Sequence, residues 1–191
     1  MSSIIGSQTS RNLMIAYTGE SMAINRYTYY SKIAKKEGYE QISAIFLETA
    51  EHEKSHAKTF YRFMEGQAVE LNARFPETIL GTTIENLKAA INGENEEWKN
   101  MYPDFEKTAL EEGFKSIATK FKLIAKIEQF HGERFKKLLE NIDSQMVFKK
   151  ANKVKWICRK CGFIHESEFA LRNCPACDHP QAYFEILAEN Y

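Results

Sequence analysis

Cysteine is absent from residues 1–157, and all four cysteines of this chain lie between Cys158 and Cys177. A fold held together by disulfides is therefore excluded for most of the chain. Excess charge is absent as well, because 26 Lys and Arg balance 26 Asp and Glu. Proteins that bind nucleic acids usually carry a basic excess, so no nucleic-acid partner is expected.

Long apolar runs are also missing. No stretch of the sequence approaches the roughly 20 apolar residues that a membrane-spanning helix needs. The segment from Met1 to Asn12 lacks the apolar core of a signal peptide. We therefore expect a soluble, cytoplasmic protein with no membrane partner.

Helical periodicity is what the chain does contain. Its 191 residues give room for one domain of usual size and a small one, and 43% of them are hydrophobic, enough to bury a core. Apolar residues recur with a helical period in four segments, at 9–36, 38–65, 80–111 and 113–142. Gly38 and Gly113 interrupt the first and third connections, whereas Gly66 to Pro76 is longer and less periodic. This pattern predicts a mainly α fold, a ferritin-like four-helix bundle with one long crossover.

The composition changes after the fourth segment. Residues 143–155 are interpreted as a linker, and residues 156–191 hold all the cysteines together with Pro175 and Pro180. We predict two domains, a four-helix bundle over 1–147 and a small metal-knuckle domain over 148–191.

The bundle sequence contains an internal duplication. Residues 11–20 align with 85–94 at an offset of 74 residues, and residues 37–60 align with 112–135 at an offset of 75. Two copies of this length do not make a solenoid. The duplication instead predicts two helical hairpins packed face to face around a pseudo-twofold axis.

Both repeats carry the same acidic pattern, with one glutamate on the first helix and a Glu-x-x-His on the second. The residues are Glu20, Glu53 and His56 in the first repeat, and Glu94, Glu128 and His131 in the second. Residues three apart share a helix face. Four helices that each supply such residues match the ligand pattern of di-iron carboxylate bundles.

These acidic residues interrupt apolar stripes. Glu20 stands in a stripe that runs from Leu13 to Tyr27, and apolar residues flank both Glu-x-x-His pairs. A buried carboxylate must be paired or must bind a metal, and two divalent cations would neutralise four glutamates. The alternative, a solvated helix face, explains one Glu-x-x-His but not two on equivalent helices.

Three further residues lie near this pattern. Glu97 follows Glu94 by one turn and has no counterpart in the first repeat, so it is either a ligand or a solvated residue. Tyr27 and Tyr102 match each other at an offset of 75. They are interpreted as core aromatics or as hydrogen-bond donors to the ligand carboxylates.

Asn12 and Asn86 match each other at an offset of 74. A metal-bound histidine normally gives its other ring N–H to an acceptor, which an Asn carbonyl can provide. We predict this role for both, with a position near a helix start or on the surface as the alternative.

The cysteines form two pairs, Cys158-x-x-Cys161 and Cys174-x-x-Cys177. Two such pairs predict a tetrahedral four-thiolate site, which suits structural zinc or a redox-active single iron. Four aromatic residues are expected to form a small core around it: Trp156, Phe163, Tyr183 and Phe184. His179 is interpreted as a surface or packing residue and not as a fifth ligand.

Together these motifs resemble the rubrerythrin family across nearly the whole chain. The resemblance rests on Gly19-Glu20-Ser21, Glu53-x-x-His56-Ala57, Gly93-Glu94-x-x-Glu97, Met101-Tyr102-Pro103, Glu128-x-x-His131 and the two cysteine pairs. It implies a ferritin-like bundle followed by a rubredoxin-like domain. The implied activity is reduction of hydrogen peroxide to water, with electrons passing through the single-iron centre.

The resemblance also implies the site residues. The diiron ligands would be Glu20, Glu53, Glu94, Glu97, Glu128, His131 and, in the reduced state, His56. The single iron would be held by Cys158, Cys161, Cys174 and Cys177. The candidate catalytic residues are Glu97, His56, Tyr27 and Tyr102. The implied electron donor is an NADH-linked rubredoxin or flavoprotein reductase.

Counting the charges of the irons and glutamates suggests why the site has a fifth glutamate, Glu97. Two ferrous ions carry four positive charges, which the four repeat glutamates already neutralise. Hard ferric iron favours oxygen ligands over imidazole, so a fifth carboxylate gains on oxidation. We therefore predict that Glu97 is a ligand in the oxidised site and that His56 replaces it on reduction.

An oligomer is expected, since one bundle must bring its diiron site close to a four-cysteine centre. The resemblance implies a head-to-tail homodimer or a larger homo-oligomer. Two alternatives remain. A ferritin-type ferroxidase has no need of an electron-feeding domain, and a zinc-ribbon interaction module on a structural bundle does not explain the glutamates in the apolar stripes.

Overall fold

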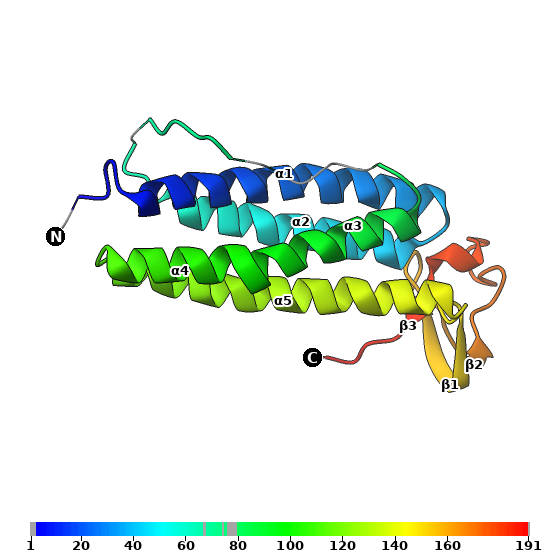
Figure 1. Ribbon diagram of the computed structural model, residues 1–191. Coiled ribbons are helices and arrows are strands. Elements are labelled where there is room, and N and C mark those ends of the chain that lie inside the picture. The colour runs from blue at the N-terminus through cyan, green and yellow to red at the C-terminus, as the bar shows by residue number, and fades with distance from the viewer. Residues whose placement is uncertain (1–2, 67, 74, 76–79, 191) are drawn as a thin grey trace.

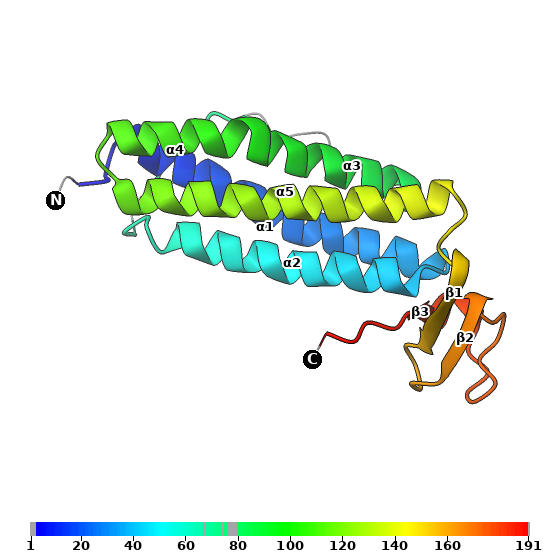
Figure 2. The same cartoon turned by 90° about the horizontal axis from the view of Figure 1, so that it is seen from below.

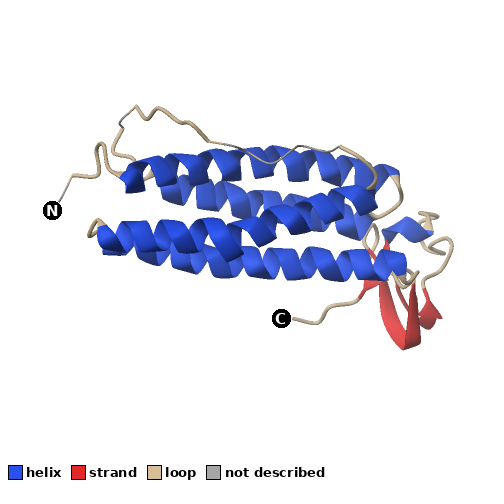
Figure 3. Cartoon of the chain, in the orientation of Figure 1, coloured by secondary structure: helices blue, strands red, loops and turns tan. Residues whose placement is uncertain are grey.

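The computed structural model describes every residue except 1–2, 67, 74, 76–79 and 191. Long helical rods lie side by side, with a small sheet at one end (Figures 1 and 3). The helices are α1 (Gln8–Lys36), α2 (Glu40–Tyr61), α3 (Thr83–Glu96), the π-helix η1 (Glu97–Met101), α4 (Tyr102–Glu111) and α5 (Lys115–Asp143). The predicted mainly α fold, a four-helix bundle followed by a small domain, is confirmed.

The four rods are α1, α2, α5 and a continuous rod made of α3, η1 and α4. Helix α1 packs along α2, and α5 packs along the α3–η1–α4 rod. The sheet lies where α1 turns into α2, and the N-terminus lies at the opposite end (Figures 1 and 2). Within the described ranges, none of the helices is both long enough and apolar enough to cross a membrane.

Glycines make the two short connections. Gly38 follows α1 with φ 86°, and Gly113 follows α4 with φ 87°. Both are in the left-handed region, where glycine carries no penalty. The residue after each glycine donates its N–H back to the preceding helix, at 2.8 and 2.7 Å. Each connection is therefore a tight helix-ending turn that reverses the chain, as the sequence predicts.

The long crossover joins α2 to α3. It spans residues 62–82, and its described residues run along the outside of α1 (Figure 1). The predicted crossover, Gly66 to Pro76, lies within it, although residues 67, 74 and 76 fall outside the described part of the chain. At its end Thr82 caps α3, accepting the N–H of Glu85, whose carboxylate accepts the N–H of Thr82 in return.

Each helical hairpin also provides a glutamate to the helix start of the other hairpin. Glu112, after α4, accepts the backbone N–H groups of Gln8 (2.9 Å) and Thr9 (2.8 Å) at the start of α1. Glu37, after α1, accepts the N–H of Thr83 (3.0 Å) at the start of α3. A carboxylate satisfies the free N–H groups and the helix dipole there. These crossed caps hold the two hairpins in register.

Glu112→Gln is expected to lower the free energy of unfolding by about 1 kcal/mol, the size typical of a lost helix cap. Burial opposes ionisation, but hydrogen bonds from Thr9 and Gln8 and the charge of Arg11 lower the pKa of Glu112 below its ordinary 4.5. A carboxylate with a lowered folded pKa stabilises the fold above the unfolded pKa. It loses that contribution as the pH falls through the folded pKa.

The stability difference between Glu112→Gln and the unchanged protein should therefore shrink in acid. Urea unfolding at neutral pH and near pH 3 measures it. Glu111→Gln, a neighbouring change at an exposed position, is the control and should have little effect. Equal destabilisation by Glu112→Gln at both pH values would contradict the ionic cap.

The π-helix η1 explains a register change between the repeats. Positions up to Glu94 match the first repeat at an offset of 74, and positions from Tyr102 onward match it at 75. The second repeat therefore holds one additional residue between them. A π-helix absorbs it through an i→i+5 hydrogen bond, here from the N–H of Tyr102 to the carbonyl of Glu97. Glu97 begins this widened turn, in the stretch where the offset between the repeats changes.

Two aromatic clusters close the interior of the bundle on either side of the acidic residues. One contains Phe60, Tyr102 and Phe121, and the other contains Tyr27, Phe46 and Phe135. The phenylalanine rings lie 5.2 Å apart in the first cluster and 5.1 Å apart in the second. The clusters correspond through the duplication, so the acidic residues between them are shielded from water along both directions of the bundle.

The small domain is a three-stranded antiparallel sheet in the order β2-β1-β3. Its strands are β1 (Lys149–Cys158), β2 (Ile164–Phe169) and β3 (Phe184–Ile186), with a 3-10 turn η2 (Gln181–Tyr183) before β3. The domain rests on the α1–α2 turn, where the ring of Phe148 stacks on Tyr39 with centroids 6.5 Å apart.

The linker predicted over residues 143–155 is wrong in its second half, because β1 begins at Lys149. The stretch from Lys149 to Lys155 has four lysines and little apolar alternation, so its side chains do not indicate a strand. Backbone pairing with β2 holds it, for example between Val154 and Ser167.

The predicted aromatic core of the small domain is confirmed. Trp156 and Phe184 are buried, and Phe163 and Tyr183 pack against them. His179 packs its ring edge-on against Tyr183 at 4.7 Å and bonds through Nδ1 to the carbonyl of Cys177 at 2.9 Å. It is therefore a packing residue, as the sequence predicts.

Candidate metal centres

Six ligand-type side chains meet in the middle of the bundle. They form two groups, in each of which the ligand atoms lie within 4.8 Å of one another: Glu20, Glu53, His56 and Glu128, and Glu53, Glu94, Glu128 and His131. None of them is more than 6% exposed. Glu53 and Glu128 belong to both groups. The arrangement is therefore that of two adjacent metal positions with two shared carboxylates.

The two histidines occupy equivalent places in this arrangement. His56 Nδ1 lies 2.9 Å from an oxygen of Glu53 and 2.9 Å from an oxygen of Glu128. His131 Nδ1 lies 3.1 Å and 2.8 Å from the other oxygens of the same two carboxylates. Each shared carboxylate thus turns one oxygen to each side, as a bridging ligand would.

Several of these atoms have no hydrogen-bond partner among the described residues. They are Glu20 Oε2, Glu53 Oε1, Glu94 Oε2, both carboxylate oxygens of Glu128, and His131 Nδ1. Buried polar atoms normally have a partner, and lone pairs that hydrogen bonds leave free are what a cation takes up. The residues fit a pair of metal ions, and a set of carboxylate and imidazole ligands suits iron.

The charge of the cluster also favours a pair of bound metal ions. Burial, with the neighbouring carboxylates, raises the pKa of Glu20 and Glu94 well above 4.5. In Glu53, burial is outweighed by the close imidazoles of His131 and His56, which lower its pKa to about 2. Four ionised carboxylates need compensating positive charge in a buried site. Two divalent cations supply it.

Tyrosines bind the outer carboxylates across the repeats. Tyr27 on α1 donates its hydroxyl hydrogen to Glu94 on α3, and Tyr102 on α4 donates to Glu20 on α1. Both rings also belong to the aromatic clusters, so the two interpretations of these tyrosines hold together. Such hydrogen bonds orient the carboxylate toward the ligand groups.

Asn12 and Asn86 do not serve the histidines, and that prediction is wrong. The side-chain carbonyl of Asn12 accepts a hydrogen bond from Gln8 at 2.9 Å. Asn86 exchanges two hydrogen bonds with the backbone of Gly81, each 2.9 Å. Both residues are buried near helix starts, where Asn86 satisfies backbone groups and Asn12 bonds a neighbouring side chain, so the helix-start alternative applies.

His52 takes the place that was predicted for asparagine, and sequence reasoning missed it. Its Nδ1 lies 3.1 Å from His131 Nε2, and the two rings stack with centroids 5.2 Å apart. If a metal ion occupied His131 Nδ1, Nε2 would carry the ring proton and would donate it to His52. The corresponding position in the second repeat is Ile127, so the duplication gave no signal for His52.

His52→Ala is expected to weaken metal binding at the His131 position about 10–100-fold, the usual effect of losing the acceptor behind a ligand histidine. His52→Gln keeps an acceptor and should recover most of the affinity. Anaerobic titration of metal-free protein with Fe²⁺ gives the affinities. Equal losses in the two variants would show that His52 only fills space.

Glu97 stands at the edge of the cluster and outside both groups. It is half-buried, at the start of η1. Its Oε1 lies 3.9 Å from where a Cβ on Gly19 would be, and it lines a cavity on the outer side of the cluster. Burial and the charges of Glu128 and Glu53 raise its pKa well above 4.5.

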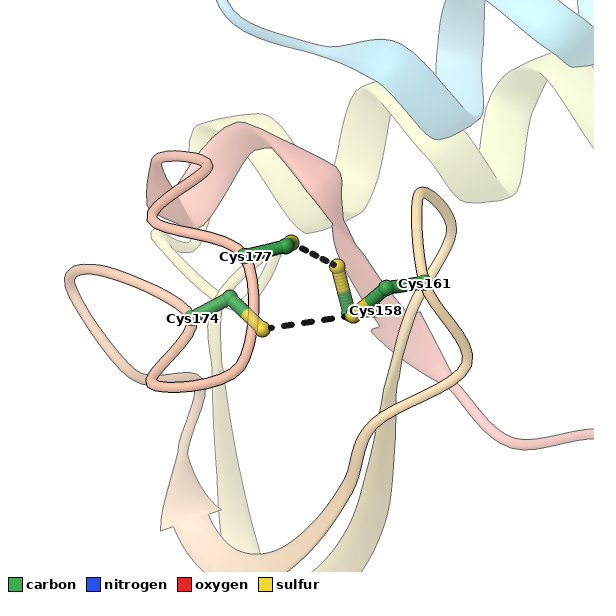
Figure 4. A group of neighbouring side chains, drawn as sticks. All are labelled: Cys158, Cys161, Cys174 and Cys177. Atoms are coloured by element: carbon green, nitrogen blue, oxygen red, sulfur yellow. Dashed lines mark hydrogen bonds between the residues drawn. The ribbon is translucent and has the colours of Figure 1, made fainter.

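The four cysteines converge in the small domain. Their sulfurs lie within 4.8 Å of one another, with Cys158 and Cys177 3.8 Å apart and Cys161 and Cys174 3.5 Å apart. All four are free thiols, and Figure 4 shows them pointing toward one another from two loops. Four sulfurs so placed fit a tetrahedral iron or zinc ion.

The two cysteine loops repeat one backbone shape. Gly162 follows the first pair with φ 79° and donates its N–H to the carbonyl of Cys158 at 2.8 Å. Asp178 follows the second pair with φ 58° and donates to the carbonyl of Cys174 at 2.9 Å. Each loop is thereby closed on its own first cysteine, which turns both sulfurs of the pair inward.

Comparison with known proteins accounts for both centres. Residues 11–139 match the family Rubrerythrin, and residues 156–185 match the rubredoxin-like domain of rubrerythrin. Rubrerythrin-1 of Clostridium acetobutylicum is 55% identical to this chain, with 100% of both chains covered. Rubrerythrin of Porphyromonas gingivalis is 52% identical, over 99% of this chain and 94% of the other.

Solved structures agree with these relatives. A structure of nigerythrin in a mixed-valence state superimposes with a TM-score of 0.64 at 31% identity, over 97% of this chain and 88% of the other. A bacterioferritin from Desulfovibrio desulfuricans, at 20% identity and a TM-score of 0.65, shares the fold of the bundle over 73% of this chain and 82% of the other.

Proposed function

Because this chain belongs to the rubrerythrin family, carrying a diiron site with Glu and His ligands and a four-cysteine rubredoxin-like site, we propose that it reduces hydrogen peroxide to water. The observation that carries the proposal is the pair of ligand groups that share Glu53 and Glu128, with Glu97 beside them on a cavity wall. The chemistry is assigned to residues 1–147 and the electron supply to residues 148–191.

The proposed ligand assignments rest on the two groups that share Glu53 and Glu128. Glu20 and His56 would hold one iron and Glu94 and His131 the other, with the two shared carboxylates between them. Glu97 and His56 are proposed as alternative ligands, Glu97 in the oxidised site and His56 in the reduced one. Support comes from the position of Glu97, which is at the edge of the cluster and begins the widened π turn.

A reduced diiron pair supplies the two electrons that peroxide cleavage needs. The overall change takes up two protons, breaks the O–O bond and yields two waters. The protein's own contribution is placement. Tyr27 and Tyr102 hold the outer carboxylates by hydrogen bonds. The aromatic clusters exclude water from the site. Glu97, on the cavity wall, would contact a peroxide that enters the cavity.

Electron delivery is proposed to run between chains. The four-cysteine domain lies beyond the end of α5 (Figure 1). Glu128 stands fifteen residues before Asp143, the end of that helix, or about 22 Å along it. Electron tunnelling falls steeply with distance, so the four-cysteine centre of a second, head-to-tail copy is the proposed donor. That centre would be recharged by an NADH-linked rubredoxin or flavoprotein reductase.

The direct test uses iron-loaded protein, reduced without oxygen and mixed with one equivalent of hydrogen peroxide per diiron site. The protein should consume the added peroxide in a single turnover, and the visible spectrum should change to that of the oxidised site. Reduced protein mixed with oxygen and excess ferrous iron is the comparison. Faster reaction with oxygen, and storage of the excess iron as mineral, would favour a ferritin-type ferroxidase instead.

A further inference from the structure

A large cavity lies beside the diiron site. It has a volume of about 720 Å³ and lies between α1 and the α3–η1–α4 rod, with residues of the crossover along its border. Cavities of this size hold organic ligands of drug-like size. Hydrogen peroxide, with two heavy atoms, uses only a small part of such a space.

The cavity is elongated along α1. Successive turns of that helix line it from Ile15 through Gly19, Met22 and Arg26 to Tyr30, a length of about 22 Å. Glu97 lies opposite, near Gly19, so the cavity extends from the edge of the metal site in both directions. This shape suits a chain-like molecule whose reacting group is in its middle.

The two directions differ in chemistry. On one side of Glu97 the walls include Ile15, Met101 and Phe105, which suit an alkyl chain. On the other side the cavity meets Arg26, about 10 Å along α1 from Gly19. A ligand that matches both directions is apolar at one end and carries a hydrogen-bond acceptor or a negative charge at the other.

Arg26 is the residue of the cavity wall that would bind a negatively charged group. Its Nε is buried and has no hydrogen-bond partner among the described residues, and no ion pair of the described chain includes it. Among the described residues, the acidic ones on the cavity wall are Glu96, Glu97 and Asp104. Glu96 and Asp104 are exposed, and Glu96 accepts a hydrogen bond from Asn100. Arg26 is half-buried, and a guanidinium whose buried Nε has no hydrogen-bond partner favours a carboxylate.

We propose that this cavity binds a free fatty-acid hydroperoxide, with its carboxylate on Arg26, its hydroperoxide group at Glu97 and its alkyl end among Ile15, Met101 and Phe105. The reaction rests on the proposed peroxide reduction. The O–O bond of the hydroperoxide breaks, two electrons from the reduced site and two protons are consumed, and the products are the hydroxy fatty acid and one water. A lipid-esterified hydroperoxide lacks the free carboxylate that Arg26 recognises.

Binding is tested without turnover, on the full chain loaded with zinc. Titration calorimetry compares a hydroxy fatty acid, which cannot be reduced, with its methyl ester. The acid should bind at least about tenfold more tightly, as expected for one charge-assisted hydrogen bond. Arg26→Gln should remove that difference, whereas Arg11→Gln, an exposed arginine on the same helix, should keep it. Equal binding of acid and ester by the unchanged protein would overturn the assignment of Arg26.

Turnover measurements with two peroxides distinguish this inference from the proposed reduction of hydrogen peroxide. With iron-loaded protein, Arg26→Gln should lower the ratio of kcat/KM for the fatty-acid hydroperoxide to that for hydrogen peroxide by about tenfold. Reduction of hydrogen peroxide but not of the fatty-acid hydroperoxide by the unchanged protein would overturn the inference and leave the proposed function standing. Reduction of neither peroxide would overturn the proposed function and the inference with it.

Discussion

Cys174→Ser is expected to abolish steady-state reduction of hydrogen peroxide from an NADH-linked rubredoxin-type donor. A single turnover by protein whose diiron site has been reduced chemically should persist. Cys174 is buried, and its sulfur lies 3.5 Å from that of Cys161. A serine there removes one thiolate of four from the candidate iron site. The bundle residues that would carry out the peroxide chemistry remain untouched by the change.

A loss of folding in the small domain must be separated from a loss of electron transfer. Protein with zinc in the four-cysteine site keeps the tetrahedral thiolate geometry but has no accessible redox step. It should behave like Cys174→Ser in both assays. Glu166→Gln, a change on β2 away from the cysteines, should keep donor-fed turnover. Undiminished donor-fed turnover in protein that lacks iron at this site would reject the electron route.

The duplication made much of the bundle predictable. Helices, short turns and the Glu-x-x-His pairs recur at a constant spacing, and repeated apolar stripes show which faces meet. The π turn shows the limit of this reasoning. The offset changes from 74 to 75 between Glu94 and Tyr102, but a helix that widens and a helix that breaks would give the same shift. Backbone hydrogen bonding decides between them, and no side-chain pattern reports it.

His52, which has no counterpart in the other repeat, was missed by sequence reasoning. His52 faces His131, yet its partner position is Ile127, so nothing marked it as part of the site. Asn12 and Asn86 do have matching positions near helix starts, but Asn12 bonds the Gln8 side chain and Asn86 bonds the Gly81 backbone. Matching positions indicate a common environment and do not say which neighbour a side chain bonds.

Strand β1 was missed for a different reason. A strand is recognised by alternating apolar residues, and the first seven residues of β1 are mostly lysine. The pairing that stabilises it comes from β2, fifteen residues further on, and depends on backbone groups. Long-range pairing of this kind is invisible in a local pattern.

Glu20→Gln is expected to change the stability of the metal-free protein and the binding of metal in opposite directions. The side chain is wholly buried, and Tyr102 donates to one of its oxygens while the other has no partner among the described residues. Glutamine keeps the acceptor for Tyr102 and adds an N–H₂ group that faces the carboxylates of Glu53 and Glu128. It also removes one charge from a crowded acidic cluster.

In the metal-free protein, Glu20→Gln should therefore raise the free energy of unfolding by about 1–3 kcal/mol. Burial and neighbouring carboxylates raise the pKa of Glu20 well above its ordinary 4.5. A carboxyl with a raised folded pKa takes up a proton on folding, so stability falls as the pH rises above the unfolded pKa. Glutamine has no such dependence, and the advantage of the variant should grow from pH 5 to pH 7.

In the metal-loaded protein, Glu20→Gln should instead lower the free energy of unfolding. Glutamine is a poorer ligand than a carboxylate, and it leaves one metal position with less negative charge. Glu94→Gln is the matched variant at the other position, and Glu51→Gln, exposed on α2, is the control for a lost surface charge. Urea unfolding of chelator-treated and iron-loaded protein, with metal content per chain, measures both effects. Two bundle metals should fall toward one in either buried variant.

The opposed signs are what separate a metal ligand from a structural carboxylate. A glutamate retained for its hydrogen bond to Tyr102 would lose little on conversion to glutamine, with or without metal, because the acceptor remains. A glutamate whose role is to bind metal destabilises the metal-free protein, because each buried carboxylate raises the free energy of the empty cluster. Destabilisation of the metal-free protein by Glu20→Gln would place this residue in the first class and remove it from the ligand set.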